Sequence, residues 1–181
     1  MVEVKVTGLK YDEKARSHVV FLSEVKDGTP SGRVLPIWIG PAEASAIGME
    51  LLGKKFQRPL THDLMATIVK GLRATVTKVM ISDLRENTFY ANIVLEREKD
   101  HEIVNVDARP SDGIALALKT GAPIYLSEKV LESAREVKVA KRASTDEKSR
   151  GEEEKTEEER AEELRKFLED LDPGDFGKLS P

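Results

Sequence analysis

The sequence contains no cysteine. This absence excludes disulfide bonds, thiolate zinc sites and cysteine nucleophiles, and it fits a reducing compartment. No apolar run in the 181 residues approaches the roughly 18–20 residues of a membrane-spanning helix. The N-terminus, MVEVKVTGLKY, alternates like a β-strand and lacks the apolar segment of a signal peptide. We therefore expect a cytoplasmic protein that does not associate with a membrane.

Several motifs of known chemistry are also missing. The chain has neither a Walker loop nor a Gly-x-Gly-x-x-Gly motif, which are typical of nucleotide-binding sheets. It has no Gly-x-Ser-x-Gly elbow either, so nothing supports acyl-transfer chemistry.

The first part of the chain lacks an excess charge of either sign. Residues 1–131 carry 18 Lys and Arg against 17 Asp and Glu, whereas residues 132–181 carry 11 against 16. A nearly neutral body does not bind nucleic acid through its overall charge. Any contact with a polyanion therefore needs a local basic patch.

The chain does contain a series of apolar runs with clear periods. Alternation and β-branched residues predict strands over residues 2–11, 18–25, 33–40, 74–84, 88–98, 102–108 and 123–127. Helical spacing predicts helices over residues 41–55, 58–72 and 110–122. This order (βββ-αα-βββ-α-β) has no repeated βαβ unit, and its short connections favour antiparallel pairing. The expected fold of residues 1–135 is α+β, with mostly antiparallel strands and three helices.

The composition changes after residue 135. Residues 136–160 are highly charged and low in complexity, which is typical of a disordered linker. Residues 161–176 follow as an amphipathic C-terminal helix that ends at Pro173 and Gly174, with its stripe formed by Ala161, Leu164, Phe167, Leu168 and Leu171. A single amphipathic helix cannot bury its stripe alone, so it must dock on the body, on a second copy or on a separate protein partner.

The segment NVDARPSDGIALALK, residues 105–119, gathers polar residues around a proline that suits a first helical position. One interpretation is structural: Asp112 helps to cap the helix, and Arg109 pairs with Asp107. The other interpretation is chemical. Asp107 and Asp112 would converge to bind Mg²⁺ or Mn²⁺, and Arg109 and the Ser111 region of the first helical turn would bind a phosphate.

Two further segments carry candidate residues. In RPLTHDLM, Thr61 is the expected N-cap, and Asp63 either assists the helix start or joins His62 as a catalytic pair, with Arg58 available to a phosphate. In GPAEA, Glu43 is either a solvated acid in a first helical turn or a metal ligand that points into a shared pocket.

Four segments in order resemble the bifunctional nuclease domain family of bacteria and archaea. They are LPIWIGPAEASAI (35–47), RPLTHDLM (58–65), DARPSDGIALAL (107–118) and PIYLSEKVL (123–131). The resemblance implies a compact α+β homodimer that cleaves RNA and single-stranded DNA with the help of a metal. One position departs from the family, which commonly has Ala where this chain has Gly113. Glycine inside a helix costs about 1 kcal/mol relative to alanine, so local stability is in question here.

Two hypotheses about function result. The first is a metal-assisted nuclease, with His62, Asp63, Asp107, Arg109 and Asp112 in one pocket. The second is a non-catalytic dimeric module that binds a ligand or a protein and uses its C-terminal helix for docking. Convergence of the 58–63 and 107–112 segments would favour the first hypothesis.

Overall fold

The structure is a computed structural model, and it describes residues 1–132. The predicted linker at 136–160 and the predicted helix at 161–176 lie outside the described residues. No helix within residues 1–132 is long and apolar enough to cross a membrane. The cytoplasmic location stays a prediction.

The described residues form an α+β fold, and the elements follow the predicted order. The strands are β1 (Val2–Asp12), β2 (Ser17–Lys26), β3 (Thr29–Ile39), β4 (Ala74–Arg85), β5 (Thr88–Arg97), β6 (Ile103–Ala108) and β7 (Ile124–Leu126). The helices are α1 (Pro41–Leu51), α2 (Thr61–Gly71) and α3 (Pro110–Thr120), and residues 128–132 after β7 are also helical. Helix α1 ends four residues earlier than expected, because the backbone turns at Gly53 with a φ of 62°.

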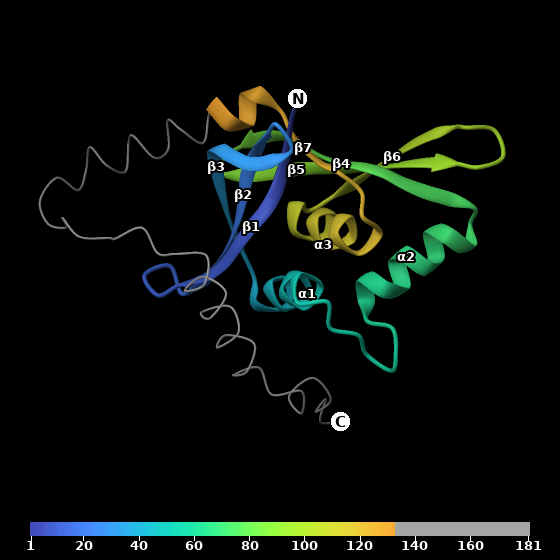
Figure 1. Ribbon diagram of the computed structural model, residues 1–181, viewed down its shortest axis with the longest axis horizontal. Coiled ribbons are helices and arrows are strands. Elements are labelled where there is room, and N and C mark those ends of the chain that lie inside the picture. Colours follow the sequence, from blue (N-terminus) through green and yellow to red (C-terminus); the bar gives the residue numbers. More distant parts are fainter. Residues whose placement is uncertain (133–181) are drawn as a thin grey trace, which may run out of the picture.

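The seven strands form one sheet in the order β3-β2-β1-β7-β4-β5-β6 (Figure 1). Strands β1–β3 and strands β4–β6 are two antiparallel meanders. The short strand β7 joins the meanders, since it pairs antiparallel with β1 and parallel with β4. The sheet is therefore mostly antiparallel, as predicted, but its centre is made by the last strand of the described residues.

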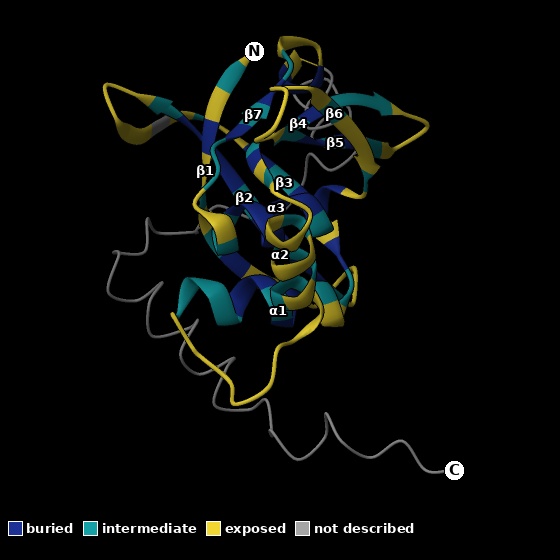
Figure 2. Cartoon of the chain, turned by 90° about the vertical axis from the view of Figure 1, so that its right-hand side faces the viewer, coloured by how far each residue is buried: buried dark blue, intermediate teal, exposed yellow. Residues whose placement is uncertain are grey.

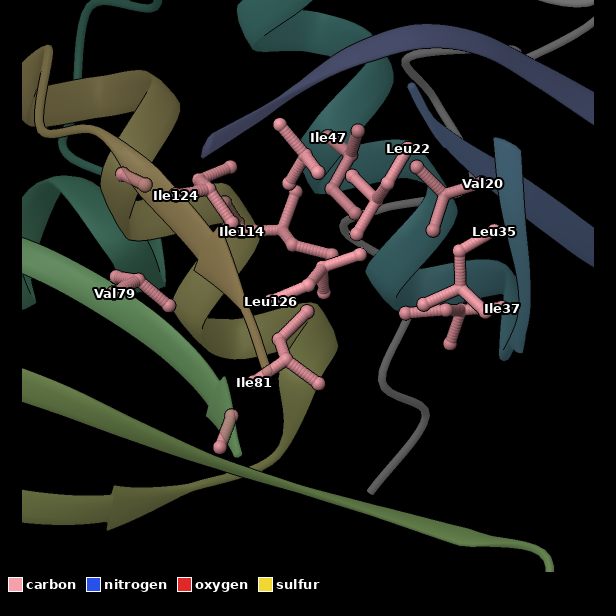
Figure 3. Close-up of a cluster of buried hydrophobic side chains, with 14 of the residues drawn as sticks. Val20, Leu22, Leu35, Ile37, Ile47, Val79, Ile81, Ile114, Ile124 and Leu126 are labelled. Carbon is pink, nitrogen blue, oxygen red and sulfur yellow. The ribbon is translucent and has the colours of Figure 1, made fainter. Parts of the chain in front are cut away.

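The hydrophobic core crosses the boundary between the two meanders (Figure 3). Leu22 and Leu35 come from the first meander, Val79 and Ile81 from the second, and all are at most 1% exposed. The buried helix residues Ile47 and Ile114 complete the core. Helix α3 packs against β4, β5 and both other helices, so its first turn is held in a fixed position beside α1 and α2.

Gly113 lies on α3 against Val79 of β4. A Cβ atom at this position would be only 2.8 Å from Cγ1 of Val79, which is closer than two carbon atoms can pack. The absence of a side chain thus allows this helix to sit against this strand, which gives a physical reason for the departure from the alanine common in the family.

Helix α2 has no buried residue. The stripe that the sequence predicts on it, Leu64, Ile68 and Leu72, is exposed by 52%, 51% and 72%. Figure 2 shows this helix together with the exposed loop of residues 53–60 that precedes it. The helix therefore presents an apolar face on the surface of the described chain.

Candidate active site

The first turns of the three helices meet at one place on the molecule. Glu43 lies in the first turn of α1, His62 in the first turn of α2, and Asp112 in the first turn of α3. Arg109 is the N-cap residue of α3 and has an extended backbone. Pro110 follows it at the first helical position. We call these four side chains, Glu43, His62, Arg109 and Asp112, the Arg109 cluster.

Arg109 binds two carboxylates. Its Nε lies 2.7 Å from Oδ2 of Asp112, and its Nη1 lies 2.8 Å from Oε1 of Glu43. A third contact, 3.1 Å long, joins Nη2 to Oδ1 of Asp112. A guanidinium has five N–H groups, so these contacts leave one N–H on each terminal nitrogen. Because the Arg109 side chain is 65% exposed, those two donors are accessible to an oxyanion.

His62 stands next to the same aspartate. Its Nε2 lies 3.5 Å from Oδ1 of Asp112 and is buried without a hydrogen bond among the described residues. The imidazole side chain is 14% exposed. The 58–63 and 107–112 segments therefore do converge, which is the arrangement that the nuclease hypothesis predicts.

The electrostatic state of Asp112 follows from its neighbours. Burial raises the pKa of the carboxyl group, but the hydrogen bonds from Arg109 and the proximity of His62 outweigh burial and lower it. Asp112 is thus a carboxylate at neutral pH, and it can orient both the guanidinium and the imidazole.

Two adjoining cavities open beside the Arg109 cluster. The first, about 740 Å³, contains all four cluster residues in its wall and is otherwise lined mainly by Ala42, Ala46, Met49, Phe56, Pro59 and Leu60. We call it the apolar cavity. The second, about 540 Å³, is lined in part by Lys54, Lys55, Lys70 and Lys119, and we call it the lysine-lined cavity. Both cavities share Phe56 and His62, so a chain-like ligand could extend from one to the other.

Asp63 lines the lysine-lined cavity only. Its Oδ1 lies 2.5 Å from Nζ of Lys119, which also contacts Glu50, and its Oδ2 accepts a hydrogen bond from the backbone N–H of Leu60. These contacts lower the pKa of Asp63, and the contact with Lys119 has the largest effect. Asp63 rather than Thr61 therefore caps α2, because Thr61 is already helical and Leu60 holds the N-cap position.

Asp107 does not join the cluster. It pairs in register with Asn92, whereas its neighbours Val106 and Ala108 pair with Ile93 and Ala91, which are buried in the core. Successive side chains of a strand point to opposite faces, so Asp107 lies on the face of the sheet away from α3. The predicted convergence of Asp107 and Asp112 is therefore wrong, and the ion pairs of Arg109 among the described residues are with Glu43 and Asp112.

The two remaining candidates lie outside the cavity walls. Arg58 is exposed in the loop before α2, and Ser111 is only 7% exposed in the first turn of α3. Neither residue lines one of the two cavities. Their predicted phosphate contacts stay predictions, and Arg58 has the more accessible side chain.

The Arg109 cluster contains two carboxylates that could bind a divalent cation. Mg²⁺ and Mn²⁺ favour several converging oxygen ligands, and Glu43 and Asp112 supply such oxygens. Both carboxylates, however, contact Arg109, and residues 1–132 contain no group of three His, Asp or Glu side chains that could hold a metal. As arranged, these residues do not fit the predicted metal site, and the requirement for Mg²⁺ or Mn²⁺ stays a prediction.

Sequence reasoning missed three residues of the cavities. Ser45 is 3% exposed, lines the apolar cavity and has a hydroxyl without a hydrogen-bond partner in the described part of the chain. Phe56 lies in the wall shared by both cavities, and Lys119 joins α1 and α2 to α3 through its ion pairs. Lys119 follows Asp112 by seven residues, and this helical spacing is the one signal that could have placed it on the same face.

Comparison with known proteins gives consistent matches. A family model described as the bifunctional nuclease domain matches residues 20–138, a range that includes the whole Arg109 cluster. An uncharacterized protein of Mycobacterium tuberculosis (strain H37Rv) is 37% identical over 185 residues, covering 97% of this chain and 98% of that protein. Bifunctional nuclease 1 of Oryza sativa subsp. japonica is 22% identical over 123 residues, covering 67% of this chain and 36% of the rice protein.

Proposed function

This chain belongs to the bifunctional nuclease domain family, and on that premise we propose that it is a nuclease that hydrolyses phosphodiester bonds in RNA and single-stranded DNA. The observation that carries the proposal is the Arg109 cluster. An imidazole, a carboxylate and a guanidinium with free N–H groups meet in the wall of one cavity. Those are the side chains that phosphodiester hydrolysis uses.

Each side chain has a role in the proposed reaction. Arg109 binds a non-bridging phosphate oxygen through its two remaining N–H groups and stabilises the charge that grows there. His62 removes a proton from a water molecule while the water oxygen bonds to phosphorus and the bond to the leaving oxygen breaks. The protonated imidazole then returns its proton to the leaving oxygen. Asp112 and Glu43 hold the guanidinium, and Asp112 also faces the imidazole.

The lysine-lined cavity supplies the local basic patch that a polyanion needs. Its wall contains Lys54, Lys55, Lys70 and Lys119 against two acidic residues, Glu50 and Asp63. Both acidic residues are already paired with Lys119. We propose that phosphates on one side of the scissile bond follow this surface, which makes binding weaken with salt.

The test is a cleavage assay of the purified full-length protein. End-labelled single-stranded RNA and DNA are incubated with Mg²⁺, with Mn²⁺ and with EDTA, so that any metal requirement is measured directly. We expect cleavage by the wild type and a loss of about 100-fold in His62→Gln. The matched control is His101→Gln, because His101 is exposed, pairs with Glu96 and lies in the turn after β5.

Equal activity of the two histidine variants would overturn the catalytic role of His62, and it is also the result that a contaminating nuclease would give. No cleavage by any variant under any condition would leave the alternative, a non-catalytic dimeric module that binds a ligand or a protein.

We also propose that the protein is a homodimer and that the apolar face of α2 takes part in the interface. Leu64, Ile68 and Leu72 are all more than half exposed on one helix. Contiguous apolar residues on the surface of a soluble protein mark interaction sites. A second copy can cover such a face symmetrically, because an isologous interface pairs the same surface with itself.

A further inference from the structure

The apolar cavity is larger and less polar than the hydrolysis of a phosphodiester requires. Its volume of about 740 Å³ lies in the range of small-molecule sites, and apart from Lys54 its charged lining residues all belong to the Arg109 cluster. A phosphate group would contact only that charged part. Most of the remaining wall is apolar and suited to a flat apolar group, and is formed by Ala42, Ala46, Met49, Phe56, Pro59 and Leu60.

We propose that the apolar cavity binds one unpaired nucleobase of the substrate strand, next to the phosphate held by Arg109. This inference rests on the proposed nuclease function and adds the part of the substrate that the enzyme recognises. The ligand class is a single nucleotide: a base in the cavity and its phosphate at the Arg109 cluster.

Ser45 is the first observation that points to a ligand. Its side chain lies on α1 in the cavity wall and is 3% exposed, yet its Oγ has no hydrogen-bond partner in residues 1–132. A buried hydroxyl without a partner destabilises the folded protein, so such groups are rare. A base entering the cavity would supply the partner. Because a hydroxyl both donates and accepts, Ser45 can pair with the edge of any base.

Phe56 is the second observation. Its side chain is 47% exposed in the loop between α1 and α2. Burial of only part of the ring contributes little to the stability of the free protein. Its position in the wall shared by both cavities puts an aromatic ring beside His62 and the Arg109 cluster. Aromatic side chains in such positions stack on bases of single strands with little regard to sequence.

The same geometry predicts that a duplex is a poor substrate. A base inside a double helix is stacked and paired, so it reaches a cavity in a protein only after it is turned out of the helix. The base site is adjacent to the Arg109 cluster, so the scissile phosphate and an unpaired base must be presented together. Single-stranded RNA and DNA meet this condition without unpairing.

The experiment measures binding without cleavage. Adenosine 5′-monophosphate, cytidine 5′-monophosphate and ribose 5-phosphate are titrated into the full-length protein by calorimetry. We expect both nucleotides to bind at least about ten-fold more tightly than the sugar phosphate, because only they place a base against Phe56. Phe56→Ala should abolish this difference, whereas Tyr90→Ala, a matched change of an aromatic residue that is 41% exposed on β5, should leave it.

Ser45→Ala gives an independent readout. Removal of an unpartnered buried hydroxyl should leave the melting temperature unchanged or higher, while nucleotide affinity falls several-fold. A lower melting temperature with unchanged affinity would show that Ser45 has a structural partner and would overturn its role. Equal binding of nucleotides and ribose 5-phosphate by the wild type would overturn the base site itself.

These outcomes are separable from those of the cleavage assay. Nucleotide binding that depends on Phe56, combined with an absence of hydrolysis, would keep the base site and reject the nuclease. Hydrolysis combined with equal binding of nucleotides and sugar phosphate would keep the nuclease and reject the base site.

Discussion

The carboxylate of Asp112 binds the guanidinium of Arg109 at two points, with Oδ2 2.7 Å from Nε and Oδ1 3.1 Å from Nη2. The two residues are separated by one turn of chain at the start of α3, so the pair is built locally. What the tertiary fold adds is Glu43 from α1 and His62 from α2. A local ion pair becomes a candidate active site because two other helices begin at the same place.

The contrast between Asp112 and Asp107 gives the first prediction. Asp112→Asn removes the charge that holds Arg109 and faces His62, so we expect cleavage of single-stranded RNA to fall about 100-fold. Asp107→Asn should change activity by less than about two-fold, because that side chain lies on the other face of the sheet. Both variants are measured in the end-label assay, with circular dichroism as a check on folding. Loss of activity in Asp107→Asn alone would show that the Arg109 cluster is not the reaction site.

The second prediction concerns pH. The ion pair with Arg33, whose Nε lies 2.9 Å from Oε2 of Glu24, lowers the pKa of Glu24 to about 2 from an ordinary value of 4.5. The folded pKa lies below the unfolded one, so this pair stabilises the protein above about pH 5 and loses its effect as the pH falls toward 2.

The measurement is urea unfolding of the wild type and Glu24→Gln at a series of pH values. The wild type should be the more stable at neutral pH, and the difference in unfolding free energy should shrink steadily below about pH 5. A difference that stays constant down to about pH 2.5 would contradict this assignment.

Gly113 and Val79 should be energetically coupled. Gly113→Ala places a methyl group where Cγ1 of Val79 lies 2.8 Å away, so we expect destabilisation by about 1–3 kcal/mol despite the better helix propensity of alanine. Val79→Ala removes the clash, so the double variant should be more stable than the sum of the two single changes predicts. Chemical denaturation of all four proteins completes the cycle. Additive effects would mean that α3 does not depend on the close approach.

The fourth prediction tests the α2 face. Ile68→Glu puts a charge in the middle of the exposed stripe and should convert a dimer into a monomer in sedimentation equilibrium, with the fold intact. Ile103→Glu is the matched control, since Ile103 is 52% exposed on β6 against 51% for Ile68. If both variants keep the association state of the wild type, the interface lies elsewhere.

Much of the fold could be predicted from local patterns. Alternation and helical spacing identify each strand and helix within a few residues, because those periods report which face of an element is buried. The position of β7 between β1 and β4 could not be predicted, because the sequence IYL does not indicate which strands it pairs with. The exposure of α2 could not be predicted either, since an apolar stripe looks the same whether it faces the core or a partner.

The candidate site could also be predicted only in part. Glu43, His62, Arg109 and Asp112 stand out because polar residues in first helical turns are accessible and close to free N–H groups. Their convergence depends on how α1 and α2 pack on α3, which local patterns do not contain. Asp107 appeared to belong with Asp112 because the two are close in sequence. Side chains alternate along a strand, however, so Asp107 lies on the face of the sheet away from α3. Ser45 resembles an ordinary small residue of a buried helix.

The three residues of β7 determine the order in which the two halves of the sheet can fold together. Val2 pairs with Leu126, so the middle of the sheet closes a loop that spans nearly the whole described chain. Each meander can form from nearby residues, but their facing edges, β1 and β4, stay unpaired until β7 arrives. Contacts so distant in sequence form slowly, because the entropy of closing the loop comes before the gain from pairing. On the ribosome, the first meander is therefore synthesised before β7, its neighbour in the sheet. Leu126 has to emerge before the two meanders can join into one sheet.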